Sequence, residues 1–228
     1  MSEKPIRTMK YQSYAVSAQR IEPNDSADDF PTPPWATRAL LEHVLDNKAG
    51  LKEMSCLEPA CGAGHMAKVL NEYFGEVKAS DAYWYGYSDI RDYLTYPYET
   101  NSCDWVITNP PFRLAEEFII RSMRVARKGV AMLARTVFLE SRGRYENIFR
   151  DMPVTKFAQF TERVPMVKGR LDRKASTATG YAWFVWEKDG SYEPRLMWVP
   201  PCRKALERPS DYPVLQSDMA VVAPIKLR

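Results

Sequence analysis

A short apolar run that ends in two consecutive prolines constrains this chain more than any other stretch of its sequence. Residues 104–112 read Asp-Trp-Val-Ile-Thr-Asn-Pro-Pro-Phe. Tryptophan, valine and isoleucine favour a strand, whereas Pro110 and Pro111 lack the N–H group that a sheet ladder requires. We therefore expect a buried strand that stops at Asn109 and continues into a rigid turn. That turn can offer carbonyl acceptors to an amino group and the Phe112 ring to a flat ligand.

A second strand-and-turn unit precedes this one in the chain. Residues 55–65 read Ser-Cys-Leu-Glu-Pro-Ala-Cys-Gly-Ala-Gly-His, and a helical pattern follows over 66–74. Gly62 and Gly64 allow positive φ and close backbone approach, and the helix N-terminus directs free N–H groups into the same crevice. The third glycine of a dinucleotide-binding motif is absent. A cofactor loop is the favoured interpretation, and a strand-to-helix turn without a ligand is the alternative.

Two acidic positions follow the glycine turn. The strand predicted over 76–81 ends at Asp81, about 20 residues after the glycines, where an acidic side chain binds a ribose hydroxyl in doubly wound sheets. Asp92 is a candidate acceptor for an exocyclic amino group, with a solvated loop aspartate as the alternative. The aromatic segment 83–87 between them predicts a loop over the crevice.

The remaining apolar patterns alternate between helix and strand. Thr32 is expected to cap a first helix, with Pro33 and Pro34 in its first turn. Further elements are expected as helices at 36–46, 114–127 and 142–152 and as strands at 129–134, 155–164 and 181–186. Strands alternating with helices predict a doubly wound α/β sheet that is mostly parallel and binds its ligands at the carboxyl ends of the strands.

A basic loop lies between the last two predicted strands. Residues 165–180 lack hydrophobic periodicity and contain four candidate nucleic-acid contacts, which are Lys168, Arg170, Arg173 and Lys174. Long loops in compact domains are commonly functional, and lysine and arginine suit phosphate groups. A solvated charge run that binds nothing is the alternative.

Composition sets wider limits. The net charge of +3 over 228 residues permits nucleic-acid binding but does not argue for it. Four cysteines without C-x-x-C spacing and only two histidines make a structural zinc site unlikely and favour a reduced, cytoplasmic protein. No apolar run is long enough for a membrane span. We expect an N-terminal arm at 1–29, a catalytic domain at 30–190 and a proline-rich tail at 191–228 packed on it. The oligomeric state stays open.

The ordered set of motifs resembles the S-adenosylmethionine-dependent adenine-N6 DNA methyltransferases. It is similar to the gamma type, in which donor-binding motifs precede the catalytic turn, and to its small phage or prophage forms. The resemblance implies a class I methyltransferase (Rossmann-like) fold with seven strands, the last one antiparallel. Only about forty residues follow Trp186, whereas gamma-type members carry a large C-terminal target-recognition domain, so a short or relaxed sequence preference is expected.

The resemblance also implies roles for particular residues. The Asn-Pro-Pro-aromatic motif would be catalytic, comprising Asn109, Pro110, Pro111 and Phe112. Cofactor contacts are implied at Phe30, Thr32 and Pro33 for the methionine part, at Glu58, Ala60, Cys61, Gly62 and Gly64 for the methionine and sulfonium, at Asp81 for the ribose, at Asp92 and Tyr93 for the adenine ring, and at Asn109 beside the donor. No metal is implied.

The implied activity is methylation of the adenine N6 amino group in duplex DNA, on a base extruded from the helix. The same tetrapeptide type serves methyltransferases that act on RNA bases or on a glutamine amide of protein, so these substrates remain alternatives. A non-catalytic nucleic-acid-binding subunit is an alternative of another class. A cytosine-C5 enzyme would need a nucleophilic Pro-Cys, and Pro201-Cys202 lies outside any strand-and-turn context. The biological setting, such as restriction–modification or phage protection, stays open.

Overall fold

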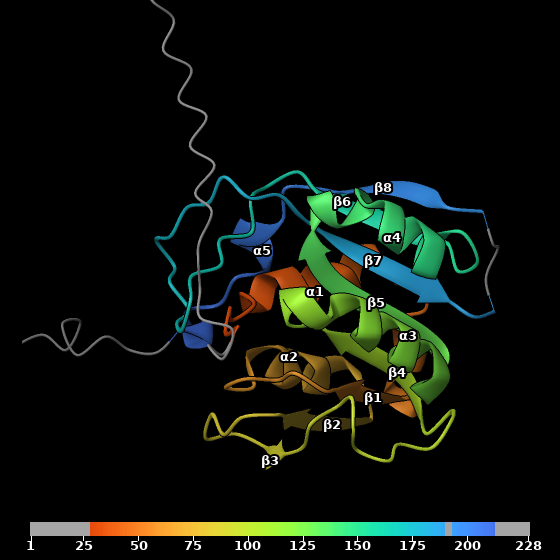
Figure 1. Ribbon diagram of the computed structural model, residues 1–228. Coiled ribbons are helices and arrows are strands. Elements are labelled where there is room, and N and C mark those ends of the chain that lie inside the picture. Colours follow the sequence, from red (N-terminus) through yellow and green to blue (C-terminus); the bar gives the residue numbers. More distant parts are fainter. Residues whose placement is uncertain (1–27, 190–192, 213–228) are drawn as a thin grey trace, which may run out of the picture.

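The fold is built on one mixed sheet, shown in a computed structural model that describes residues 28–189 and 193–212. Within these residues the sheet has eight strands in the order β3-β2-β1-β4-β5-β7-β6-β8 (Figure 1). The strands are β1 Ser55–Glu58, β2 Glu76–Asp81, β3 Asp89–Ile90, β4 Cys103–Thr108, β5 Ala126–Arg135, β6 Lys156–Phe160, β7 Tyr181–Glu187 and β8 Arg195–Val199. The α-helices are α1 Pro34–His43, α2 His65–Tyr73, α3 Ala115–Val125, α4 Arg142–Arg144 and α5 Arg203–Leu206. Shorter helical turns are η1 Ala49–Glu53, η2 Phe112–Leu114, η3 Thr136–Leu139, η4 Tyr145–Phe149 and η5 Pro209–Asp211.

The strand directions confirm a doubly wound, mostly parallel sheet. The neighbouring strands from β3 to β5 all pair in parallel, and β7 runs antiparallel between β5 and β6. The resemblance implies seven strands, and the sheet has a further one, β8, which pairs in parallel with β6 and so extends that edge. It comes from the segment expected to be an extended tail.

Helices cover both faces of the sheet and divide the core in two. On one face α1 and α2 pack against Ile107, Leu133 and Trp183, which are fully buried. On the other face α3 packs against Val106 and Phe184. Apolar residues that alternate along β4, β5 and β7 supply both cores, which explains why these central strands read as continuous apolar runs.

Two local expectations fail for identifiable reasons. Thr32 does not cap α1, because the helix begins at Pro34 and the carbonyl of Pro33 accepts the first bond from Ala36 N–H at 2.8 Å. The helix expected over 142–152 is broken into α4 and a π-type turn at η4. The Ser141 hydroxyl caps this short segment by accepting from Arg144 N–H.

The described part of the C-terminal segment lies against α1. Arg38 of α1 is 3% exposed and donates to Glu72 of α2, to Asp211 and to the Leu206 carbonyl, with distances of 2.7–3.1 Å. Two acidic side chains from different elements are thereby tied to one buried guanidinium. Residues 1–27 and 213–228 of the expected arm and tail lie outside the described residues.

The carboxyl ends of the parallel strands share one end of the sheet, at the left of Figure 1. The loop at 165–180 and the N-terminus of α1 lie at the same end. Among the described residues, no helix combines the length and apolarity needed to cross a membrane.

Candidate active site

Asn109 stands where β4 ends, and its side-chain amide is fixed in one orientation. Its Nδ2 donates to the Phe30 carbonyl at 2.9 Å and lies 3.7 Å from the Met166 sulfur. A backbone carbonyl can only accept, so the NH2 group must face Phe30. The Oδ1 atom is therefore the end that faces away, and it is buried without a hydrogen-bond partner.

Aromatic rings surround the end of the turn at residues 109–112, which the motif predicts to be catalytic and which we call the catalytic turn. The Phe112 ring lies 5.3 Å from that of Phe30 and 6.5 Å from that of Tyr181, between centroids. The Arg135 guanidinium sits over the Phe112 ring at 4.2 Å. Arg135 is exposed and ends β5, so this cation–π contact covers one face of the Phe112 ring with a side chain at the surface.

Asp28 holds the turn from outside. Its Oδ2 accepts from Phe112 N–H at 2.7 Å, the first N–H group after the two prolines. Asp28 stands only two residues before Phe30, but its side chain carried no signal of a role in the sequence. The segment 28–30 therefore contacts the catalytic turn through both Asp28 and the Phe30 carbonyl.

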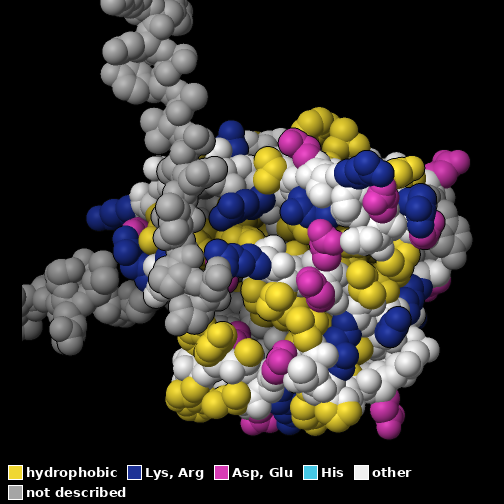
Figure 2. All heavy atoms as spheres, viewed as in Figure 1, with side chains coloured by type: hydrophobic (Ala, Val, Ile, Leu, Met, Phe, Trp, Pro, Cys, Tyr) yellow, Lys and Arg dark blue, Asp and Glu magenta, His cyan; other side chains and the backbone are white. Residues whose placement is uncertain are grey.

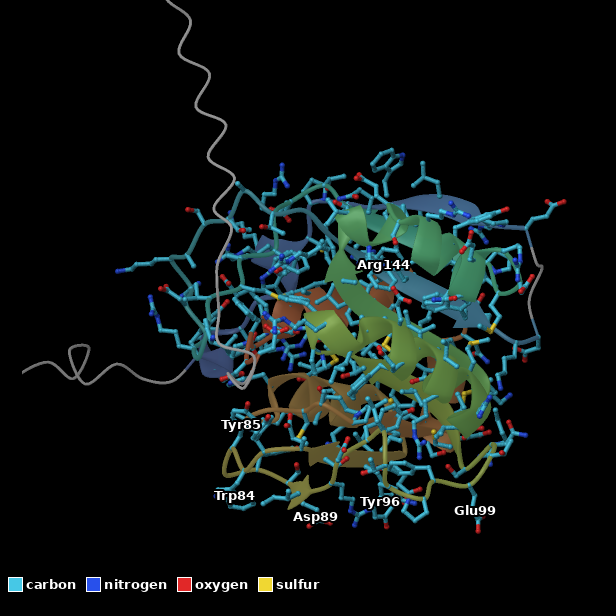
Figure 3. The ribbon with its side chains drawn as sticks, in the orientation of Figure 1. Trp84, Tyr85, Asp89, Tyr96, Glu99 and Arg144 are labelled. Carbon is cyan, nitrogen blue, oxygen red and sulfur yellow. The ribbon has the colours of Figure 1, made fainter. Side chains whose placement is uncertain are left out.

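The glycine turn and Asp81 are joined directly. Gly62 N–H donates to Asp81 Oδ2 at 2.9 Å, and Gly62 has φ of 50°. Gly64 has φ of 78°, and a Cβ atom there would lie 2.4 Å from the Tyr87 ring. The close approach confirms that the aromatic loop covers the glycine turn, and Figure 3 shows Trp84 and Tyr85 of that loop at the same end of the sheet.

Acidic side chains concentrate around this turn. Burial, and then the charge of Asp81, raises the pKa of Glu58 to about 8, so its buried carboxyl is mostly protonated at neutral pH. Burial also raises the pKa of Asp81. Burial and the Asp81 charge raise the pKa of Asp29, against the opposing effect of Lys168. A ligand with positive charge would relieve this repulsion.

Four more of the expected cofactor contacts are buried or half-buried. The Cys61 thiol lies 2.9 Å from the Ser88 hydroxyl, and burial raises its pKa to about 12, so it remains a neutral thiol. Thr32 and Pro33 are buried at the N-terminus of α1, and Thr32 Oγ1 has no partner. Ala60 is half-buried within the loop.

Unpaired buried oxygens mark the same end of the sheet. Thr32 Oγ1, Glu58 Oε2 and Asn109 Oδ1 are all buried without partners. Leaving such a group unsatisfied costs about 1–3 kcal/mol each, and proteins seldom do so without a reason. A ligand with hydrogen-bond donors would satisfy these oxygens.

Of the two expected contacts to the adenine ring, Asp92 is exposed and Tyr93 is buried. Asp92 is exposed, and its carboxylate accepts from Leu94 N–H at 3.0 Å and from the Thr95 hydroxyl at 3.1 Å. Tyr93 is 1% exposed, and its hydroxyl lies 2.9 Å from the Ser122 hydroxyl in the core behind α3. A cofactor contact by Tyr93 is thus left to its backbone, because its aromatic ring is already packed.

The basic loop borders the catalytic turn. Met166 contacts Asn109, and Gly169 N–H donates to the Asp29 carbonyl at 2.9 Å. Two of its four candidate cations are engaged within the protein, since Arg170 pairs with Asp172 and Arg173 with Glu207, each at 3.2 Å. Lys168 lies close enough to Asp29 to lower its pKa. Lys174 is exposed and forms no ion pair with a described residue.

Several residues of this site escaped the sequence analysis. Arg135, Tyr181 and Asp29 reach it from β5, β7 and the segment before α1. Arg135 follows the carboxyl end of a predicted strand, which was a usable signal for a site residue. Tyr181 begins an antiparallel strand, and that position gave no such signal. No group of three or more His, Cys, Asp or Glu in the described ranges is arranged to hold a metal ion.

Comparison with known proteins concerns the fold. No protein-family model matches the chain, and no curated protein sequence does. Solved structures that resemble it include a protein assigned as a type I restriction modification subunit from Vibrio vulnificus YJ016, with 17% identity and a TM-score of 0.54 over 73% of this chain. A protein assigned as a class I S-adenosylmethionine-dependent methyltransferase from Listeria monocytogenes has 13% identity and a TM-score of 0.56 over 76% of this chain.

The chain has the class I methyltransferase fold.

A third structure with this fold is a protein assigned as an RNA methyltransferase from Pyrococcus horikoshii, with 14% identity and a TM-score of 0.52 over 69% of this chain. The chain spans 46% of the Vibrio subunit, 66% of the Listeria protein and 86% of the Pyrococcus protein. At these identities the likeness extends to the methyltransferase fold and not to a substrate.

Proposed function

We propose that this protein transfers a methyl group from S-adenosylmethionine to the N6 amino group of adenine in DNA, on a base extruded from the duplex. The observation that carries the proposal is the orientation of Asn109. Its NH2 group is held by the Phe30 carbonyl, which leaves the Oδ1 atom as a buried acceptor without a partner. An amino group on a planar ring is the donor that this acceptor and the neighbouring Pro110 carbonyl suit.

The residues around the glycine turn fit the charged donor. When bound, S-adenosylmethionine supplies an electrophilic methyl group on a positively charged sulfur. Burial raises the pKa of Glu58, Asp81 and Asp29, and the charge of Asp81 raises the pKa of Glu58 and Asp29 further. A cation among these groups would favour their charged forms. Gly62 and Gly64 leave backbone within reach of a ligand, and Asp81 would hold the ribose.

Asn109 would act by positioning rather than by covalent chemistry. The lone pair of the adenine amino nitrogen is delocalised into its ring, which makes the nitrogen a weak nucleophile. Acceptance of its two hydrogens by Asn109 Oδ1 and the Pro110 carbonyl favours a pyramidal nitrogen with a directed lone pair. Orientation and fixed dipoles would supply most of the rate, and no strongly basic side chain is required.

A paired adenine must leave the helix to reach Asn109, at a cost of a few kcal/mol. Stacking on Phe112 would return about 1–3 kcal/mol. Arg135 now covers a face of that ring at 4.2 Å, and being exposed it can swing away when a base arrives. The Arg135 guanidinium would then remain beside the site to meet a phosphate.

DNA is favoured over the other substrates by two features. The motif order resembles adenine-N6 DNA methyltransferases, and a loop with four basic residues borders the catalytic turn. An RNA base and a protein glutamine amide are also planar nitrogen acceptors, so the turn itself does not separate them. The choice of polymer is tested at the end of the Discussion.

The Asn109→Ala variant tests the catalytic role. We expect loss of methyl transfer while binding of S-adenosylmethionine persists, measured by isothermal titration calorimetry, because the side chain acts mainly on the acceptor base. Asn71→Ala, on the exposed side of α2, is the matched control and should retain full activity. Turnover by Asn109→Ala at the wild-type rate would overturn the proposal.

A further inference from the structure

A second hollow lies next to the catalytic turn, on the side away from the glycine loop. It has a volume of about 390 Å³. It is formed where η3, the end of β6 with residues 161–163 after it, and the start of β7 meet the edge strand β8. Its lining includes Thr136, Gln159, Arg163, Tyr181 and Trp198. Tyr181 is shared with the candidate active site, because its ring lies 6.5 Å from that of Phe112.

We propose that this hollow holds a nucleotide of the DNA strand that carries the target adenine, with the neighbouring base stacked on Trp198. The proposal rests on the function proposed above and extends it to a substrate contact outside the catalytic turn. We call the hollow the β8 groove.

Trp198 is placed as a stacking surface rather than as a core residue. It is 65% exposed, whereas Trp183 and Trp186 of the neighbouring strand β7 are almost fully buried. It pairs in register with Gln159 of β6, so the two side chains share one face of the sheet. Figure 2 shows hydrophobic side chains standing out over β8 at the upper edge of the molecule. An exposed indole beside polar groups suits a base, since every base has a flat face.

The polar lining of the β8 groove has the chemistry of a sugar–phosphate contact. Arg163 is exposed and forms no ion pair with a described residue. Its guanidinium nitrogen would lie 3.3 Å from a Cβ atom at Gly180, so the glycine leaves it room against the groove wall. The Thr136 hydroxyl adds a further hydrogen-bonding group. The Thr161 hydroxyl and the Gln159 amide nitrogen already donate to the carbonyls of Val199 and Phe160, each at 2.8 Å.

The negative charge in the lining is already engaged. The Glu162 carboxylate accepts from the N–H groups of Cys202 and Arg203 at 2.6 and 2.9 Å. It is thus directed to the backbone that opens α5, and the Arg163 side chain remains the free charge of the β8 groove. The groove is therefore complementary to a phosphate rather than to a cation.

The β8 groove and the loop at 165–180 each reach the catalytic turn through one residue. The loop contacts Asn109 through Met166, and the groove reaches Phe112 through Tyr181, whereas β8 itself is separated from β4 by β5, β7 and β6. A DNA strand bound across the turn would reach both the loop and the groove.

DNA binding by three single variants tests the proposal. The probe is a fluorescein-labelled mixed-sequence 20-mer, as duplex and as single strand, titrated by fluorescence anisotropy with saturating S-adenosylhomocysteine. We expect Trp198→Ala to raise Kd about tenfold, as the loss of one stacked base predicts. Arg163→Ala should lower the slope of log K against log salt by about one. Leu196→Ala is the matched control, because Leu196 is 61% exposed on the same face of β8 but does not line the groove.

Two results would overturn the proposal. One is an unchanged Kd for Trp198→Ala when wild-type protein methylates DNA. In that case the proposed methylation of DNA stands, but the β8 groove takes no part in binding it. The other is a change from dimer to monomer on Trp198→Ala in sedimentation, which would make β8 an interface between copies. Loss of affinity confined to an RNA 20-mer of the same composition would contradict the DNA assignment. Absence of DNA methylation by the wild type is a separate failure, that of the proposed function.

Discussion

Asn109 shows how one contact can define a site that sequence alone describes only in outline. The tetrapeptide predicts a turn with acceptors, but either end of an amide side chain could face a ligand. The contact with the Phe30 carbonyl, 79 residues away in the chain, decides which end does. Because this partner lies in another segment, the orientation of Asn109 could be learned only from the folded chain.

If the proposed function holds, Glu58 should make donor binding depend on pH. Its pKa in the free protein is about 8 because of burial and the charge of Asp81, so most molecules carry a proton there at neutral pH. A bound cation favours the carboxylate, so binding releases a proton and affinity should rise with pH until about 8 and then level off. Calorimetry from about pH 6 to about pH 9 in two buffers of different ionisation enthalpy measures both effects. Glu58→Gln should flatten the profile, and parallel profiles for the two proteins would contradict this assignment.

Phe112 should matter most when the target base must be pulled from a helix. Loss of the ring removes about 1–3 kcal/mol of stacking that offsets extrusion, which is roughly tenfold in rate on duplex DNA. Phe112→Ala should therefore lose more activity on a paired adenine than on a mismatched or single-stranded one. Phe112→Tyr keeps the ring and is the control. Equal losses on the three substrates would argue against a role in extrusion.

At the scale of elements, the strands were predictable and their edges were not. The apolar runs of β4, β5 and β7 are buried on both faces, which leaves little choice of structure. β8 has an exposed pattern, so its pairing with β6 left no comparable signal in the sequence. The end of α1 illustrates another limit, because Thr32 has the chemistry of a cap but its hydroxyl lies unpaired beside the site.

Arg38 links three elements and should contribute strongly to stability. Burial opposes its charge, but the hydrogen bonds with Glu72 and Asp211 outweigh this and raise the pKa of Arg38. Removing one partner of a buried ion pair strands the others, so Arg38→Ala should lower the free energy of unfolding by about 3 kcal/mol. Urea denaturation followed by circular dichroism measures it. Arg150→Ala removes an exposed pair with Asp151 and should leave the midpoint unchanged. The same urea midpoint for both variants would contradict a stabilising role for the Arg38 contacts with Glu72 and Asp211.

At the scale of the molecule, the sheet brings together motifs that lie far apart in the chain. The order of strands places the ends of β1, β2 and β4 side by side, so Glu58, Asp81 and Asn109 could be grouped from the sequence once a doubly wound sheet was expected. The predicted loop over the crevice is likewise confirmed by the contact of Tyr87 with Gly64. The β8 groove could not be predicted, since it depends on how η3, β6 and β8 pack.

The fold itself does not choose among DNA, RNA and protein as the methylated polymer, and one measurement does. Wild-type protein is incubated with labelled S-adenosylmethionine and with duplex DNA, single-stranded DNA, RNA or protein extract, and the labelled products are digested and identified by mass spectrometry. The account predicts N6-methyldeoxyadenosine from DNA, absent with Asn109→Ala. Label found only in RNA or in protein, or in DNA at a base other than adenine, would contradict it.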